Sequence, residues 1–100
     1  MTLTKELNGK ALTIAMEGRL DTVTAPEAEP EVMAALDGIE SLTMDFSKLD
    51  YISSAGLRLL LNAYKAMQGK GPMKVVHVSD VVMEVFDVTG FSDVLDIESD

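Results

Sequence analysis

The segment Tyr51–Arg58 constrains the fold most, because an extended stretch gives way there to an amphipathic helix. Beyond Gly56, apolar residues recur at spacings of three and four, the period of one helix face, at Leu57, Leu60, Leu61, Tyr64 and Met67. The spacing predicts a helix that ends near Gly69.

Two adjacent hydroxyls, Ser53 and Ser54, stand at the start of this predicted helix. A serine in such a position most often caps the unpaired N–H groups of the first turn. The N-terminus also favours an anion, so the serine is either a cap or a phosphate acceptor, and it can be both. Gly56 lies in the same turn and leaves the backbone open to close approach.

Residues 2–17 predict a β-hairpin with its turn at Asn8-Gly9. With a two-residue loop, Leu7 faces Lys10 and Leu3 faces Ile14. One face is then apolar, with Leu3, Leu7, Leu12, Ile14 and Met16, and the other is polar, with Thr4, Glu6, Thr13 and Glu17. Gly18 is expected to end the second strand, and residues 19–24 to connect it to a helix.

The next helix carries a conflict between two signals. Thr24-Ala25-Pro26-Glu27 fits a capping box with proline in the first turn. Pro30 would clash with the carbonyl four residues back, so the regular helix is expected to begin at Glu29 or Pro30. A short strand over Leu42–Phe46 and a turn over Ser47–Asp50 follow.

After the central helix, Met73–Val78 predicts a strand, Ser79 the cap of a third helix, and Gly90 its C-terminal glycine. A last strand is expected over Val94–Ile97. The order β-β-α-β-α-β-α-β predicts an α/β domain over residues 1–100. Its mixed sheet of about five strands would carry the helices mainly on one side.

Composition narrows the classes of function. No apolar run approaches the ~18 residues of a membrane span, and no signal-peptide pattern is visible. Without cysteine the chain forms neither a disulfide nor a thiolate metal site. A net charge of −9 argues against nucleic acid or an anionic membrane as a direct partner, and favours a basic protein surface.

Enzyme chemistry finds little support, and a binding module without cofactor or metal is expected. His77 is the only histidine and lies within a predicted strand, where a core or edge role is commoner than that of a base. No nucleophile elbow or phosphate-binding loop is present. Asp21, Asp45 and Asp50 could converge near Ser54 to bind a metal or to act as acid and base, but such residues more often form turns and caps.

The Ser-Ser segment resembles the signature of the STAS domain family, which includes the bacterial anti-sigma factor antagonists. In that family an extended segment runs into Asp-Ser or Ser-Ser, a small residue, Gly and Leu, as Tyr51–Leu57 does here. Gly18–Asp21 resembles the Gly-x-Leu-Asp element of the family, Asp45–Ser47 the end of its central strand, and Thr89–Phe91 its late Thr-Gly-aromatic turn.

The resemblance implies a STAS-like fold and a set of site residues. Ser54 aligns with the phosphorylated serine of the family, and Ser53, where several members have aspartate, is the alternative. The surface expected to contact a partner comprises Asp21, Ser53, Ser54, Ala55, Gly56, Leu57 and Arg58. Asp45 and Ser47 are expected to support the site.

The resemblance also implies a function. The unmodified protein would bind an anti-sigma factor with serine kinase activity and so release a sigma factor. The kinase would phosphorylate the serine with ATP that it binds itself, and a metal-dependent serine phosphatase would reverse the change. All of this would occur in the cytoplasm. The alternatives are a STAS module in a stress-signalling or lipid-transport assembly, and a nucleotide-binding domain.

Overall fold

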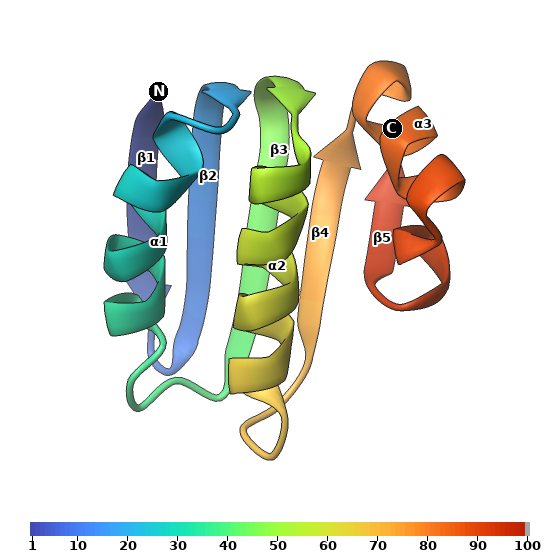
Figure 1. Cartoon of the computed structure of the whole chain (residues 1–100). Helices are drawn as coiled ribbons and strands as arrows, with labels where there is room; N and C mark the ends of the chain where they lie inside the picture. The colour runs from blue at the N-terminus through green and yellow to red at the C-terminus, as the bar shows by residue number, and fades with distance from the viewer. Residues whose placement is uncertain (100) are drawn as a thin grey trace.

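The computed structural model describes residues 1–99 and confirms the mixed α/β sheet (Figure 1). The elements are β1 (Thr2–Asn8), β2 (Ala11–Leu20), α1 (Thr24–Ala35), β3 (Ser41–Ile52), α2 (Ser54–Met67), β4 (Met73–Val78), α3 (Asp80–Thr89), a 3₁₀ turn (Phe91–Asp93) and β5 (Asp96–Ser99). The five strands lie in chain order, β1-β2-β3-β4-β5. β1 runs antiparallel to β2, and all other neighbours are parallel.

The helices lie on one side of the sheet because each crossover moves to the next strand in the same direction. Right-handed connections that always advance the same way place every helix on the same face. Figure 1 shows α1 and α2 in front of the sheet, with α3 beside β5 at its edge. The core lies between these layers, and in it Phe46 of β3 stacks with Phe86 of α3 at a centroid distance of 6.5 Å.

The register of the hairpin differs from the predicted one. Asn8 pairs with Ala11, so the two-residue loop is Gly9-Lys10, not Asn8-Gly9. Positive φ falls on Gly9, at 64°, whereas a type I′ turn needs it at both central residues. The error is two residues, which is the side-chain period of a strand, so the predicted apolar and polar faces are still correct. Leu7 lies on the predicted face but is exposed.

β2 and β3 are both longer than predicted. Gly18 does not end β2: with φ at 105° it lies at a register shift, and the strand continues to Leu20. The turn expected over Ser47–Asp50 is likewise wrong, because β3 continues to Ile52 and pairs with β2 across two irregularities. Pairing to a neighbouring strand therefore overrides the local turn signals in both places.

The expected late start of α1 is also wrong, since the helix begins at Thr24 and contains Pro30. Proline removes one hydrogen bond from the helix interior. Ala28 and Val32, on either side of Pro30, are buried against the sheet and hold both turns in place.

The C-terminal elements match most of the predictions. Ser79 caps α3 by accepting a hydrogen bond from the N–H group of Val82 at 3.3 Å, and Gly90 ends the helix with φ at 83°. The last strand begins at Asp96, later than predicted, because the 3₁₀ turn carries the chain to Leu95, whose N–H group donates to the carbonyl of Phe91 at 2.9 Å.

Candidate functional site

The candidate site lies at the carboxyl edge of the parallel strands, where α1, α2 and α3 all begin (the upper end in Figure 1). Asp21 follows β2, and Ser53 follows β3. The N–H group of Ser53 donates to the carbonyl oxygen of Leu20 at 2.9 Å, which joins the two strand ends. The loop that contains Asp21 and the start of α2 are therefore neighbours, as the sequence motifs predicted.

The two serines have different environments. Ser53 is half-buried and extended, with φ −99° and ψ 178°, and its Oγ accepts a hydrogen bond from the N–H group of Gly56 at 3.4 Å. Ser53 is therefore the cap of α2. Ser54 is the first residue of the helix and is exposed, and its hydroxyl makes no hydrogen bond to any other residue in the 1–99 range.

Gly56 serves the packing of the chain on itself. It is buried, and a Cβ placed on it would lie 2.7 Å from Ile52 Cγ1 and 2.9 Å from the carbonyl oxygen of Leu20. The close approach that the sequence predicted at this glycine is therefore made by the ends of β3 and β2.

Asp21 organises the connection before α1. Its Oδ1 accepts from the N–H groups of Val23 and Thr24 at 2.9 and 3.0 Å. Thr24 Oγ1 accepts from the N–H group of Asp21 at 2.9 Å and donates to the carbonyl oxygen of Arg19 at 2.7 Å. The predicted capping box is thus wrong. Val23 is at the N-cap position of α1, and its side chain makes no cap hydrogen bond. The Asp21 carboxylate instead binds the free N–H groups of Val23 and Thr24.

These contacts fix the charge of Asp21. Hydrogen bonds from the backbone N–H groups of Thr24 and Val23 lower the pKa of Asp21 from its usual value of 3.8, and the nearby Arg19 guanidinium lowers it further. The carboxylate is therefore ionised at neutral pH, one residue after Leu20, whose carbonyl oxygen accepts the hydrogen bond from Ser53.

Arg19 and Tyr51 were not predicted as site residues. The Arg19 guanidinium lies 4.4 Å from the centre of the Tyr51 ring and 3.9 Å from Asp21 Oδ2. The two residues are paired in register between β2 and β3. No local pattern signals this contact, because it arises only when the two strands pair.

A groove of about 300 Å³ separates the first turns of α1 and α2. Its lining residues are Ala25, Pro26, Glu29, Pro30, Ala55 and Arg58. The Glu29 carboxylate accepts a hydrogen bond from Asn62 Nδ2 at 3.3 Å, which joins the two helices. The groove therefore places predicted contact residues of α2 next to the first turns of α1.

Asp45 and Ser47 lie elsewhere. Asp45 stands between the buried residues Met44 and Phe46, so its side chain is on the face of the sheet opposite the helices. There Asp45 Oδ1 accepts from the N–H group of Ser47 at 2.9 Å. The structure therefore does not bring these two residues to Ser54, which begins a helix on the other face.

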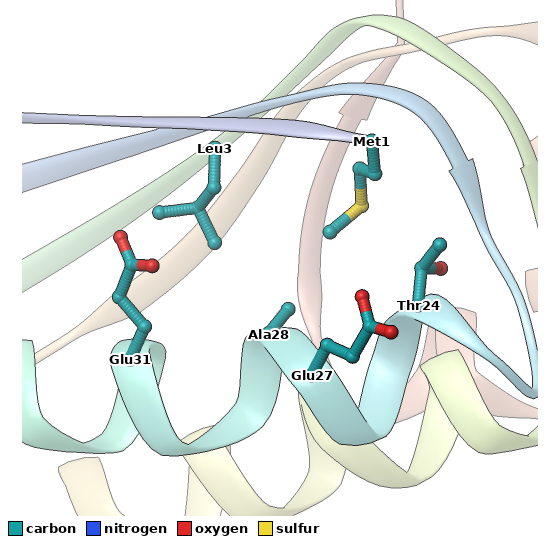
Figure 2. Close-up of a pocket in the computed structure, with 6 residues that line it drawn as sticks. All are labelled: Met1, Leu3, Thr24, Glu27, Ala28 and Glu31. Atoms are coloured by element: carbon teal, nitrogen blue, oxygen red, sulfur yellow. The ribbon is translucent and has the colours of Figure 1, made fainter.

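A second hollow, of about 200 Å³, lies between β1 and α1 (Figure 2). Met1 and Leu3 face the helix there, and the carboxylates of Glu27 and Glu31 rise from α1 toward the strand. Glu31 also forms an ion pair with Lys5 at 3.1 Å. Neither of the two serines lines this hollow.

Other kinds of site find no residues within 1–99. That range holds no group of three or more His, Cys, Asp or Glu residues suited to a metal ion. None of its helices combines the length and the apolar character needed to cross a membrane. His77 is exposed, with φ at 57°, near the end of β4.

Known proteins share both the sequence and the fold. The sequence model of the STAS domain family matches residues 2–100. BtrV of Bordetella bronchiseptica, named as a candidate anti-sigma factor antagonist, is 34% identical over 93 residues, which are 91% of this chain and 80% of BtrV. The anti-sigma-B factor antagonist of Listeria monocytogenes is 30% identical over 98 residues, covering 95% of this chain and 85% of the relative.

Solved structures repeat the architecture at lower identity. The unphosphorylated form of the anti-sigma factor antagonist SpoIIAA has a TM-score of 0.82 at 17% identity and covers 96% of this chain and 87% of that one. The phosphorylated form of SpoIIAA from Bacillus has a TM-score of 0.73 at 16% identity and covers 96% and 90%. Because the family model spans residues 2–100 and both relatives are at least 30% identical over most of the chain, the chain belongs to the STAS domain family, among proteins named as anti-sigma factor antagonists.

Proposed function

We propose that the unmodified chain binds an anti-sigma factor that is also a serine kinase, and so releases a sigma factor. Phosphorylation of Ser54 by that kinase ends the binding, and a metal-dependent serine phosphatase restores it. The chain supplies the contact surface and the acceptor hydroxyl, while the kinase supplies ATP. The exchange takes place in the cytoplasm.

The observation that carries the proposal is the difference between the two serines. Ser53 is committed to capping α2, whereas Ser54 is exposed one residue later and its hydroxyl is not engaged within residues 1–99. A kinase can reach the Ser54 hydroxyl without unwinding the helix. The names of the relatives support the class of partner, and SpoIIAA, solved in both states, indicates that this fold accommodates a phosphate.

The proposed switch is a local change of charge. The γ-phosphoryl group of ATP passes to Ser54 Oγ, the serine proton is released, and ADP leaves with the kinase. The phosphate adds close to two negative charges where a partner had fitted a hydroxyl. The helix N-terminus offsets part of this charge within the domain, so the fold survives. A penalty of ~3 kcal/mol at the interface lowers affinity more than a hundredfold.

Asp21 has a defined part in this proposal. Its ionised carboxylate is held rigidly in the loop that contacts the start of α2. We expect it to orient the incoming kinase or the acceptor hydroxyl, because a carboxylate that accepts two backbone hydrogen bonds cannot easily rotate away. Asp21→Asn should therefore slow phosphorylation, whereas Asp45→Asn, on the opposite face, is the matched control and should not.

The proposal is tested with the cognate kinase and ATP, by mapping the modified residue with mass spectrometry. Ser54→Ala should abolish phosphorylation, while Ser53→Ala should leave Ser54 as the acceptor and cost about 1 kcal/mol of stability through the lost cap. Phosphate on Ser53, persisting in Ser54→Ala, would refute the assignment.

The fold and the switch can be separated in a binding experiment. Ser54→Asp should unfold within a few degrees of wild type, because an exposed first-turn residue contributes only about 1 kcal/mol. It should nevertheless weaken binding to the kinase. A variant that binds as tightly as wild type would place this end of α2 outside the interface.

A further inference from the structure

Arg58 lies four residues after Ser54 on α2 and is exposed. Residues at i and i+4 are neighbours on a helix surface, with Cβ atoms about 6 Å apart. Helical Cα–Cβ bonds tilt toward the N-terminus, so the Arg58 side chain leaves the backbone in the direction of Ser54. We propose that Arg58 is the intramolecular partner of a phosphate on Ser54. This inference rests on the proposed function, because it presupposes that Ser54 is the modified residue.

The charges around Arg58 leave it available. None of the ion pairs formed within residues 1–99 includes Arg58. The first turn of α2 contains no acidic residue that would compete for it. Across the groove, the Glu29 carboxylate accepts a hydrogen bond from Asn62, and it forms no ion pair with Arg58 within residues 1–99.

The other arginine near the serines is engaged. Arg19 contacts the face of the Tyr51 ring and lies 3.9 Å from Asp21. Recruiting it to a phosphate would break both contacts and bring that phosphate toward the Asp21 carboxylate. Arg58 can bind the phosphate without breaking the contacts of Arg19 with Tyr51 and Asp21.

The chemistry of the two groups supports the pairing. The planar guanidinium presents parallel N–H donors that match two phosphate oxygens, a geometry that an ammonium group lacks. A serine hydroxyl offers no such acceptor pair, so the contact forms only after modification. Arg58 lines the groove between α1 and α2 in the unmodified protein. Pairing draws this cation toward the helix end, so phosphorylation also changes the charge of the groove.

The test uses the full chain with phosphoserine placed at position 54 by codon suppression. The second ionisation of the phosphate, with a pKa of about 6, is followed by phosphorus NMR. Arg58→Ala should raise this pKa by about 0.5 unit, and Arg58→Lys should give an intermediate value. Lys65→Ala is the matched control: it removes the same charge from the last turn of the same helix and should change the pKa by less than about 0.1 unit.

A second readout follows the arginine itself. The Arg58 Nε–H signal should shift and exchange more slowly with solvent when residue 54 carries phosphate than when it is serine. An unchanged phosphate pKa in Arg58→Ala would overturn the pairing. An equal rise of the pKa in Lys65→Ala would also overturn it, because the effect would then come from the net charge of the domain and not from a contact with Arg58. Since the phosphate is installed without a kinase, failure here leaves the proposed kinase reaction standing, and failure of that reaction leaves this measurement valid.

Discussion

Replacing Gly56 with alanine should destabilise the domain, although alanine is the better helix former. The added Cβ would lie 2.7 Å from Ile52 Cγ1, 2.9 Å from Leu20 Cγ and 2.9 Å from the Leu20 carbonyl oxygen. That oxygen cannot easily move, because it accepts the hydrogen bond from Ser53. Overpacking costs about 1–3 kcal/mol, and a glycine-to-alanine change within a helix gains about 1 kcal/mol. With backbone among the contacts, we expect a net loss of about 1–2 kcal/mol.

The loss is measured by thermal unfolding followed by circular dichroism, where it should lower Tm by roughly 4–15 °C. Ala55→Gly is the control, since it removes a methyl group from the adjacent residue and reports the helix propensity of the same turn. Gly56→Ala should also speed hydrogen exchange at the Ser53 amide, because α2 must move away from the end of β2. An unchanged or higher Tm in Gly56→Ala would refute the packing argument.

Further tests concern a strained glycine, the ionised Asp21 and the buried Phe86. Gly71→Ala should lower the free energy of unfolding in urea by more than about 2 kcal/mol, because φ is 155° and the new Cβ would overlap the backbone carbonyl of Glu40, just before β3. Gly38→Ala, at φ 79° in open space, is the control and should cost only about 1–2 kcal/mol. Equal losses in the two variants would contradict the overlap. The pKa of Asp21, followed by NMR, should lie below 3.8, because folding favours the ionised form. This stabilisation is present above the unfolded pKa and is lost as pH falls through the lower folded pKa. A pKa at or above 3.8 would contradict the hydrogen bonds from Val23 and Thr24. Phe86→Ala removes a fully buried ring that stacks on Phe46, and it should lower the free energy of unfolding by about 3–5 kcal/mol in the same urea assay. A loss below about 1 kcal/mol would mean that α3 does not pack against the core.

Local pattern determined the order of the helices and strands and which face of the hairpin is apolar. The hairpin shows how robust this is: its loop was misplaced, yet Leu12, Ile14 and Met16 are buried as predicted. Side chains alternate with a period of two, so an error of two residues in register leaves both faces unchanged. The burial of apolar side chains therefore sets the faces, while the turn conformation at Gly9 sets the register.

Strand pairing decided the features that local signals misjudged. Ser47–Asp50 reads as a turn in isolation, but β2 offers partners for Lys48, Leu49 and Tyr51, and the strand continues. Pro30 reads as a helix boundary, but burial of the neighbouring residues against the sheet holds α1 together. Each of these energies comes from residues distant in sequence, which a local window does not include.

Some features of the candidate site also come from local sequence and others only from the tertiary structure. The sequence by itself determined that a Ser-Ser pair would begin the central helix, because capping chemistry and apolar spacing are both local. Only the tertiary structure decided that Ser53 is the cap and Ser54 the exposed hydroxyl. It also joined Leu20, next to Asp21, to Ser53, and it placed Asp45 on the other face of the sheet. The physical reason is that parallel strands gather their carboxyl ends at one edge of a sheet, while the pleat directs Asp45, within β3, to the face away from the helices.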